Sequence, residues 1–194
     1  MGDETGEDTR VLDAARRLFA GLGYDGTTTE MIATAAGVPP SAVEGGKAGL
    51  YRAILEDFYT AQMKMFDEVE AGYRSDGGDL HRAVDRFLDF YLDHPEGLAV
   101  WLYRGLLDAV DVEDVEERFR RPLTHRLFEI FDTLESIPDP ETWISAFSWC
   151  ITGFLNGGIL TRETDPLTVA DPAARRRFRA FMHRLTGWAS SDGP

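Results

Sequence analysis

The fold of this chain is decided by residues 9–58, which read TRVLDAARRLFAGLGYDGTTTEMIATAAGVPPSAVEGGKAGLYRAILEDF. Apolar residues recur at helical spacing up to Phe19, and a glycine-rich stretch from 21 to 26 then interrupts the pattern. The threonine run 27–29 supplies capping chemistry for a short second helix that ends at Gly37, and two prolines open a third. Short helices joined by a tight, glycine-containing turn are typical of a helix-turn-helix, so the segment predicts one.

The same segment resembles the amino-terminal domain of TetR-family transcriptional regulators. The resemblance implies a three-helix DNA-binding head followed by a helical domain that binds ligands and forms a homodimer. The alternative interpretation is a generic helical core with a glycine turn. The resemblance depends on the order and spacing of these short matches: Ala14-Ala15, Leu18-Phe19, Gly23-Tyr24, Thr27-Thr28, Ile32-Ala33, Ala36-Gly37-Val38, Lys47 and Leu50-Tyr51-Arg52-Ala53.

The resemblance also implies which residues contact DNA. One group would contact phosphates: Thr27, Thr28 and Lys47. A second group, on the third helix, would face the bases: Ser41, Ala42, Val43 and Glu44.

The third helix departs from the family pattern. Val43 stands where the family has leucine, and Glu44 stands where it has a tyrosine that would touch a phosphate. Two glycines follow at once, so the helix is shorter than its relatives. Because glycine is unfavourable in a helix interior, we expect a short, frayed recognition helix, and because a carboxylate repels the phosphate backbone, we expect weakened DNA binding.

The charge of the chain also opposes DNA binding. Its net charge is −14, whereas affinity for DNA depends largely on neutralising phosphates. Several acidic residues lie in a leader, residues 1–9, which we expect to be disordered. No apolar run approaches the roughly 20 residues that a membrane span needs. The single cysteine, Cys150, excludes an intrachain disulfide and is expected to be a buried, inert thiol, and together these features predict a cytoplasmic protein.

The rest of the chain predicts helices only. We therefore expect an all-α fold of about nine helices, with a helix-turn-helix domain at residues 10–52 and a ligand-binding and dimerisation domain at residues 53–189. The helices predicted after the head cover residues 48–73, 80–93, 98–109, 112–134, 141–163 and 171–188.

The last two predicted helices are candidates for a dimer interface. The helix Glu141-Glu163 is apolar on nearly all sides, which requires burial on all sides. The helix Asp171-Trp188 is apolar on one face and rich in arginine elsewhere. The resemblance implies that this pair meets its copy in a homodimer, and the alternative is that both helices bury only intrachain core.

The middle helices are rich in aromatic residues and methionine. Such side chains ordinarily pack a core, but as a set they also commonly line a cavity. The resemblance implies an effector pocket there, and the composition favours an apolar or aromatic small molecule. Arg104 is expected either to bind an anionic group or to pair with Asp108. The candidate residues are Met63, Phe66, Phe87, Tyr91, Trp101, Phe147 and Trp149, with Arg104, His125 and Asn156 as polar groups.

Enzyme motifs are absent from the sequence. No histidine has the Glu-x-x-His or H-E-x-x-H spacing of metal sites, no G-x-S-x-G elbow occurs, and Gly46-Lys47 lacks the other P-loop positions. We therefore expect no enzyme activity, no metal and no cofactor. The sequence predicts a dimeric, ligand-responsive regulator, a repressor released from operator DNA. The alternative is a TetR-like ligand- or protein-binding module whose DNA binding is weakened or lost.

Overall fold

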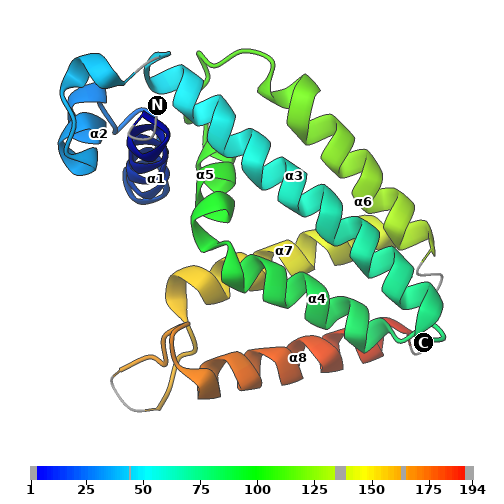
Figure 1. Cartoon of the computed structure of the whole chain (residues 1–194). Coiled ribbons are helices and arrows are strands. Elements are labelled where there is room, and N and C mark those ends of the chain that lie inside the picture. Colours follow the sequence, from blue (N-terminus) through cyan, green and yellow to red (C-terminus); the bar gives the residue numbers. More distant parts are fainter. Residues whose placement is uncertain (1–3, 44, 134–138, 163–164, 191–194) are drawn as a thin grey trace. The chain divides into compact units, whose positions relative to one another are not determined.

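The computed structural model describes residues 4–43, 45–133, 139–162 and 165–190. Within these ranges the regular structure consists of eight α-helices and two short helical turns, with no strand beyond one isolated bridge between Ile159 and Leu167 (Figure 1). The predicted all-α fold is therefore confirmed. The elements are α1 (Glu4–Leu22), α2 (Thr29–Ala36), η1 (Pro40–Ala42), α3 (Gly46–Ser75), α4 (Leu80–Asp93), α5 (Pro95–Gly105), η2 (Glu116–Arg120), α6 (Arg121–Thr133), α7 (Pro140–Gly157) and α8 (Pro172–Ser190).

The start of α1 differs from the sequence prediction. The leader was expected to be disordered, but α1 begins at Glu4 and includes most of it. Acidic side chains near a helix amino-terminus interact favourably with the helix dipole, which accounts for the extension.

Two other helices end earlier than expected. The helix predicted to reach residue 109 is α5, which ends at Gly105 because Leu107 and Ala109 have positive φ angles of 70° and 57°. The helix predicted to reach Glu163, a residue outside the described ranges, is α7, which ends at Gly157. Gly158 follows with φ of 63°, and a β-carbon there would overlap the carbonyl oxygen of Leu167.

The chain forms two compact units, which are described separately. Unit 1 comprises residues 1–62 and 94–123, and unit 2 comprises residues 63–93 and 124–194. The sequence placed the boundary of the head after residue 52, whereas unit 1 also holds α5 and η2. Sequence adjacency alone did not indicate that a segment beyond residue 93 packs with the head.

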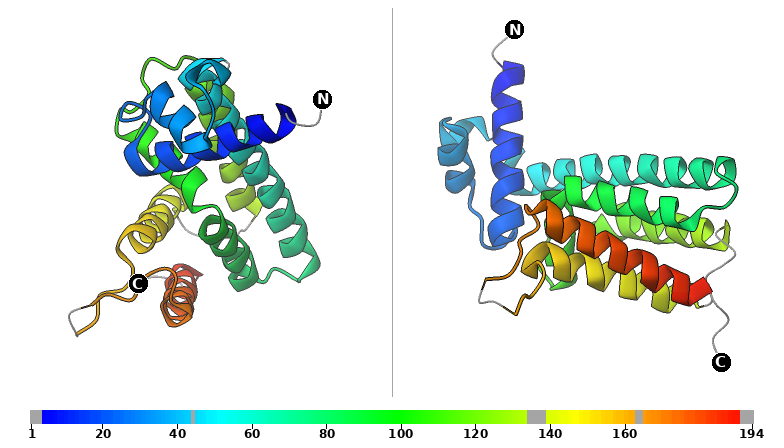
Figure 2. Two further views of the ribbon diagram at one scale, coloured as in Figure 1. Left: turned by 60° about the vertical axis from the view of Figure 1, so that its left-hand side comes forward. Right: turned by 90° about the horizontal axis from the view of Figure 1, so that it is seen from below.

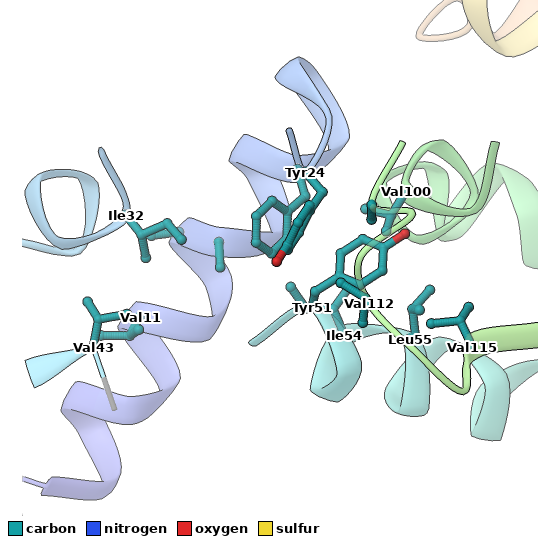
Figure 3. Close-up of a cluster of buried hydrophobic side chains, with 14 of the residues drawn as sticks. Val11, Tyr24, Ile32, Val43, Tyr51, Ile54, Leu55, Val100, Val112 and Val115 are labelled. Carbon is teal, nitrogen blue, oxygen red and sulfur yellow. The ribbon is translucent and has the colours of Figure 1, made fainter. Parts of the chain in front are cut away.

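Unit 1 has one apolar core. Helix α1 packs against α2 and α5, and buried residues from α1, α2, α3 and the segment after α5 meet between them. Three aromatic rings form its centre, since Phe19, Tyr24 and Tyr51 have centroids 5.0–5.7 Å apart. Figure 3 shows Val11, Ile32 and Val43 gathered on one side of this core.

Helix α2 has a well-defined start and end. The Thr28 hydroxyl accepts a hydrogen bond from the Met31 amide at 3.2 Å and caps the amino-terminus. At the other end Gly37 is left-handed, with φ of 70°, and the Val38 amide donates to the Ala33 carbonyl oxygen. This pairing is a Schellman motif, which stops the helix and turns the chain.

Unit 2 is a helical bundle with an aromatic centre. Helix α4 contacts both α7 and α8, and α4 and α8 run side by side in Figure 1. Across α4 and α8, Arg179 pairs with Asp85 at 2.8 Å and also with Asp89, while His183 lies 2.7 Å from Asp85. None of the described helices is both long and apolar enough to cross a bilayer.

A charged cluster ties α6 to α3 within unit 2. Arg126 donates hydrogen bonds to Glu70 at 2.6 Å and to Asp67 at 2.8 Å. The guanidinium holds the pKa of the Glu70 carboxyl below its usual range. Folding therefore favours the ionised carboxylate.

Replacing Glu70 with glutamine should remove an acid-sensitive contribution to stability. Because the folded-state pKa is lowered, the contribution is fully present above the ordinary carboxyl pKa and is lost as the pH falls through the folded-state value. We expect Glu70→Gln to lower the free energy of unfolding by up to about 1 kcal/mol at pH 7, and the difference to shrink towards pH 3. Urea unfolding across this pH range measures it. The control Glu68→Gln, at an exposed position, should show little difference at any pH.

The cap of α2 predicts a second stability effect. Thr28→Ala leaves the Met31 amide without its side-chain acceptor and should cost about 1 kcal/mol, measured by chemical denaturation. Thr34 is an exposed residue of the same helix, and Thr34→Ala should be neutral or slightly stabilising because alanine favours helix. Equal losses from the two variants would contradict the capping role.

Candidate functional site

The helix-turn-helix scaffold is present, but its third helix is not a full helix. After the Gly37 turn the chain makes only η1, a single 3-10 turn of three residues. Gly45 and Gly46 follow with φ angles of 72° and 65°, a conformation that glycine adopts without steric cost. The expected short recognition helix is therefore reduced to one turn, called the reading turn below (residues 40–43).

The structure distributes the predicted DNA contacts unevenly. Thr28 and Ser41 are exposed, and Ala42 is half-buried. The Thr27 side chain is buried, and its hydroxyl donates to the Gly23 carbonyl oxygen at 2.7 Å, so it stabilises the turn after α1. Val43 keeps only 7% of its surface exposed and lies in the head core, where a base cannot reach it. Glu44 lies outside the described residues.

Lys47 is held inside the head by Tyr24. Its Nζ donates to the Tyr24 carbonyl oxygen at 3.0 Å and lies 3.9 Å from the centre of the Tyr24 ring. Burial raises the pKa of the Tyr24 hydroxyl, and the nearby carboxylates of Asp111 and Asp25 raise it further. An ammonium group carries three donors, so this contact orients Lys47 and leaves donors for a phosphate.

Sequence reasoning missed the role of Asp108. Its carboxylate accepts hydrogen bonds from the Tyr24 amide at 2.7 Å and the Asp25 amide at 2.9 Å. Arg104 does not pair with it as expected, because the guanidinium donates to the carbonyl oxygens of Ala109 and Val112. The contact joins residues more than 80 positions apart, and no local pattern could have revealed it.

The sequence around the reading turn lacks positive charge, which is unusual for a segment that binds DNA. From residue 18 to residue 46 the sequence has no lysine, arginine or histidine. Asp25 and Glu30 lie exposed in this stretch. The cations nearest in sequence are Arg17 and Lys47. Phosphate neutralisation by this surface therefore depends on residues at its two ends.

Part of the predicted effector set comes together in unit 2. The Phe66 and Phe87 rings lie 5.8 Å apart, and Phe147 lies 6.0 Å from Phe87. Met63 and Tyr91 belong to the same unit and are half-buried. The cluster also contains two rings that were not among the site predictions, Phe131 and Trp143.

Trp143 contributes an unexpected polar group to this cluster. Its indole N–H is buried and has no hydrogen-bond acceptor among the described residues. A buried donor without an acceptor is costly, so such groups need a reason. Trp143 was assigned to an apolar helix, and its polar atom gave no separate signal in the sequence.

The other predicted effector residues do not join this cluster. Trp101 and Arg104 belong to unit 1, and Trp101 packs against the head core. His125 is exposed and lies 3.2 Å from Glu129, while the Asn156 amide is exposed and donates to the Thr152 carbonyl oxygen. Trp149 is 70% exposed on α7.

Trp149 instead lines a groove between α7 and α8. The groove has a volume of about 690 Å³. Phe154 and Phe178 form its floor, with stacked rings 4.2 Å apart. Cys150 lines this groove and is half-buried, not buried as expected, although partial burial raises the pKa of its thiol. The chain that follows α7 carries the exposed Leu160 into the same groove and extends past the helix ends (Figure 2).

Comparison with known proteins identifies the head. Residues 11–43 match the amino-terminal model of the family described as bacterial regulatory proteins, tetR family. No curated protein has a detectably similar sequence. The described residues contain no group of three or more histidine, cysteine or acidic side chains that could hold a metal ion.

Two solved structures share the fold of the chain. A TetR/AcrR-family transcriptional regulator from Aquifex aeolicus VF5 is 15% identical with a TM-score of 0.62, over 92% of this chain and 99% of its own. A putative TetR-family transcriptional regulator from Mesorhizobium loti MAFF303099 is 18% identical with a TM-score of 0.51, over 97% and 98% of the two chains. Residues 11–43 therefore match the amino-terminal model of the tetR family, and the chain has the helical fold of these two structures.

Proposed function

We propose that this chain is a cytoplasmic, homodimeric repressor without enzyme activity, which leaves operator DNA when an apolar or aromatic molecule binds unit 2. The observation that carries the proposal is the match of residues 11–43 to the tetR family model, together with the capped helix α2 and the glycine turn that follows it. The Schellman turn after α2 and the capped α2 amino-terminus are retained although the reading turn is short. Both features serve to present a surface to DNA.

The DNA-facing surface consists of the exposed start of α2 and the reading turn. Thr28 is exposed at the start of α2, where its oxygen accepts from the Met31 amide and its hydroxyl hydrogen bonds to Glu30, so to contact a phosphate the hydroxyl would exchange the Glu30 carboxylate for the phosphate oxygen. Ser41 and Ala42 are the accessible side chains of the reading turn, and a hydroxyl and a methyl group suit a base edge. Lys47, oriented by Tyr24, would supply the nearest positive charge.

The effector would enter the aromatic cluster of unit 2. Its rings, including Phe87 and Phe147, offer an apolar environment, and the Trp143 N–H would donate to an acceptor on the ligand. This arrangement favours an aromatic molecule with at least one hydrogen-bond acceptor. Because the rings pack against one another at 4.9–6.4 Å, the ligand must open the cluster to bind.

Opening of the cluster provides the regulatory step. A ligand that binds one conformation better shifts the population towards it, by its differential affinity for the two. In a dimer, two heads must match half-sites about 34 Å apart, so a small change in their spacing weakens DNA binding. A coupling of about 1–3 kcal/mol is typical of such systems.

A second candidate function has a specific observation in its favour. The stretch from 18 to 46 has no positive side chain, and the reading turn is a single 3-10 turn. Both features fit a TetR-like module that binds a ligand or a protein and has weakened or lost DNA binding. The two candidates differ in a measurable way, because specific operator binding is usually in the range of about 10⁻⁸–10⁻¹¹ M and non-specific binding about 10⁻⁴–10⁻⁶ M.

Adding a charge to the reading turn should strengthen DNA binding. We expect the wild type to bind its own upstream DNA specifically, and Ser41→Lys to bind it several-fold more tightly. The slope of log affinity against log salt should steepen by about 0.9, as for one added phosphate contact. Fluorescence anisotropy across a salt series measures both quantities.

The matched control is Thr60→Lys. Thr60 is exposed on α3, about 20 Å along the helix from Gly46, so the same charge change should leave the salt slope unaltered. If both variants change the slope equally, η1 does not face DNA. If the wild type shows only weak, sequence-independent binding, the second candidate function is favoured.

The groove between α7 and α8 is the proposed dimer surface. Phe181 is 41% exposed beside Trp149, and the neighbouring glycines and alanine allow close helix approach. Phe181→Glu would place a carboxylate in this apolar contact and should convert the dimer to monomer in analytical ultracentrifugation. Leu106→Glu, which alters a more exposed apolar residue of unit 1, should leave the dimer intact. Dissociation by both variants or by neither would place the interface elsewhere.

A further inference from the structure

We infer that Asp108 is a positioning residue for DNA binding, which acts on Lys47 through Tyr24. The inference depends on the proposed function, because Lys47 matters to DNA only if the head binds DNA. All three residues belong to unit 1. Asp108 lies more than 80 positions from Tyr24 in the sequence, so the sequence of the head gives no sign of this role.

Asp108 binds the turn that follows α1. Its two carboxylate oxygens accept hydrogen bonds from two consecutive amides, Tyr24 at 2.7 Å and Asp25 at 2.9 Å. Gly23 makes room for this contact, since a β-carbon there would lie 3.1 Å from the carboxylate, and its φ is 75°. Two charge-assisted bonds to adjacent amides fix the turn more firmly than neutral bonds would.

Tyr24 in turn binds the side chain of Lys47. The amide of Tyr24 is bound by Asp108, and its carbonyl oxygen and ring are bound by the Lys47 ammonium at 3.0 and 3.9 Å. Lys47 lies in the first turn of α3, directly after Gly45 and Gly46, which have positive φ angles. The helix sets the backbone of Lys47, and the contacts with Tyr24 orient its ammonium group.

The segment that carries Asp108 has an unusual backbone conformation. Leu107 and Ala109, on either side of it, both have positive φ angles, which are costly for residues with side chains. Apolar burial does not offset the cost at Leu107, which is 78% exposed. The bonds of Asp108 to the turn and of Arg104 to the Ala109 carbonyl oxygen hold the segment in place.

Asp108 therefore links the segment after α5 to the residues beside the reading turn. With Asp108 in place, Lys47 is held next to the reading turn with donors left for a phosphate. Without the carboxylate, the amides of Tyr24 and Asp25 lose their acceptors, and the Tyr24 carbonyl oxygen that orients the Lys47 ammonium is held less firmly. Loss of an anion should by itself favour DNA binding, so a positioning role and a charge effect predict opposite signs.

The test compares Asp108→Asn with Asp111→Asn in the full-length chain. Asp111 is exposed in the same segment, so the two variants remove the same charge. We expect Asp108→Asn to bind upstream DNA about tenfold more weakly, and Asp111→Asn to bind as tightly as the wild type or slightly more so. In a Lys47→Met background the loss caused by Asp108→Asn should disappear. An equal loss in both backgrounds would overturn the inference.

Two readouts that need no DNA separate this inference from the proposed function. Hydrogen exchange at the Tyr24 and Asp25 amides should accelerate in Asp108→Asn and not in Asp111→Asn. The Lys47 Nζ lies over the Tyr24 ring, so the adjoining ε-methylene protons should lose a ring-current shift in the same variant. Unchanged exchange and an unchanged Lys47 signal would overturn the inference, whereas absence of specific DNA binding by the wild type would overturn only the proposed function.

Val112→Ala serves as a control for stability. Val112 is buried in the same segment, and its truncation lowers stability without touching the carboxylate. The variant should unfold at lower temperature but keep the protection of Tyr24 and Asp25. If it loses that protection as Asp108→Asn does, the effect is general destabilisation and the positioning role is wrong.

Discussion

The head of this protein depends on how Tyr24 is held. Its ring packs between Phe19 and Tyr51 in the core of unit 1, and its backbone is bound on both sides by charged groups. Aromatic pairs of this kind contribute about 0.5–1.5 kcal/mol beyond their buried area. Because Lys47 and Asp108 bind the same residue, the position of α3's first turn and of the segment after α5 are fixed together.

Local patterns in the sequence located most of the helices, with errors at several ends, but they did not define the site. Helix α4 was predicted at its observed bounds because its apolar spacing is regular and proline follows it. Val43 was expected to face bases, yet it is the apolar residue that closes the head core when the turn is so short. The Asp108 contact and the place of α5 in unit 1 are tertiary features, and periodicity carries no information on either.

The reading turn buries one side chain in the core and leaves few others accessible. Burial of Val43 anchors the turn to α1 and α2, which leaves only Ser41 and Ala42 accessible within it. A longer helix would expose more side chains to DNA, as in the family pattern. The present arrangement leaves few side chains that could reach a base, so in the proposed function specificity would come from few contacts or from the shape of the DNA.

The aromatic residues of unit 2 fall into two groups, interior rings and an exposed ring on α7, which composition alone does not distinguish. Phe87 and Phe147 face the interior, whereas Trp149, only two positions after Phe147, is exposed on the opposite side of α7. A helix turns about 100° per residue, so residues two apart cannot share a face. An α7 that is apolar on both faces needs two apolar partners, and the bundle of unit 2 supplies one of them. The remaining face is the one that the proposed dimer would cover.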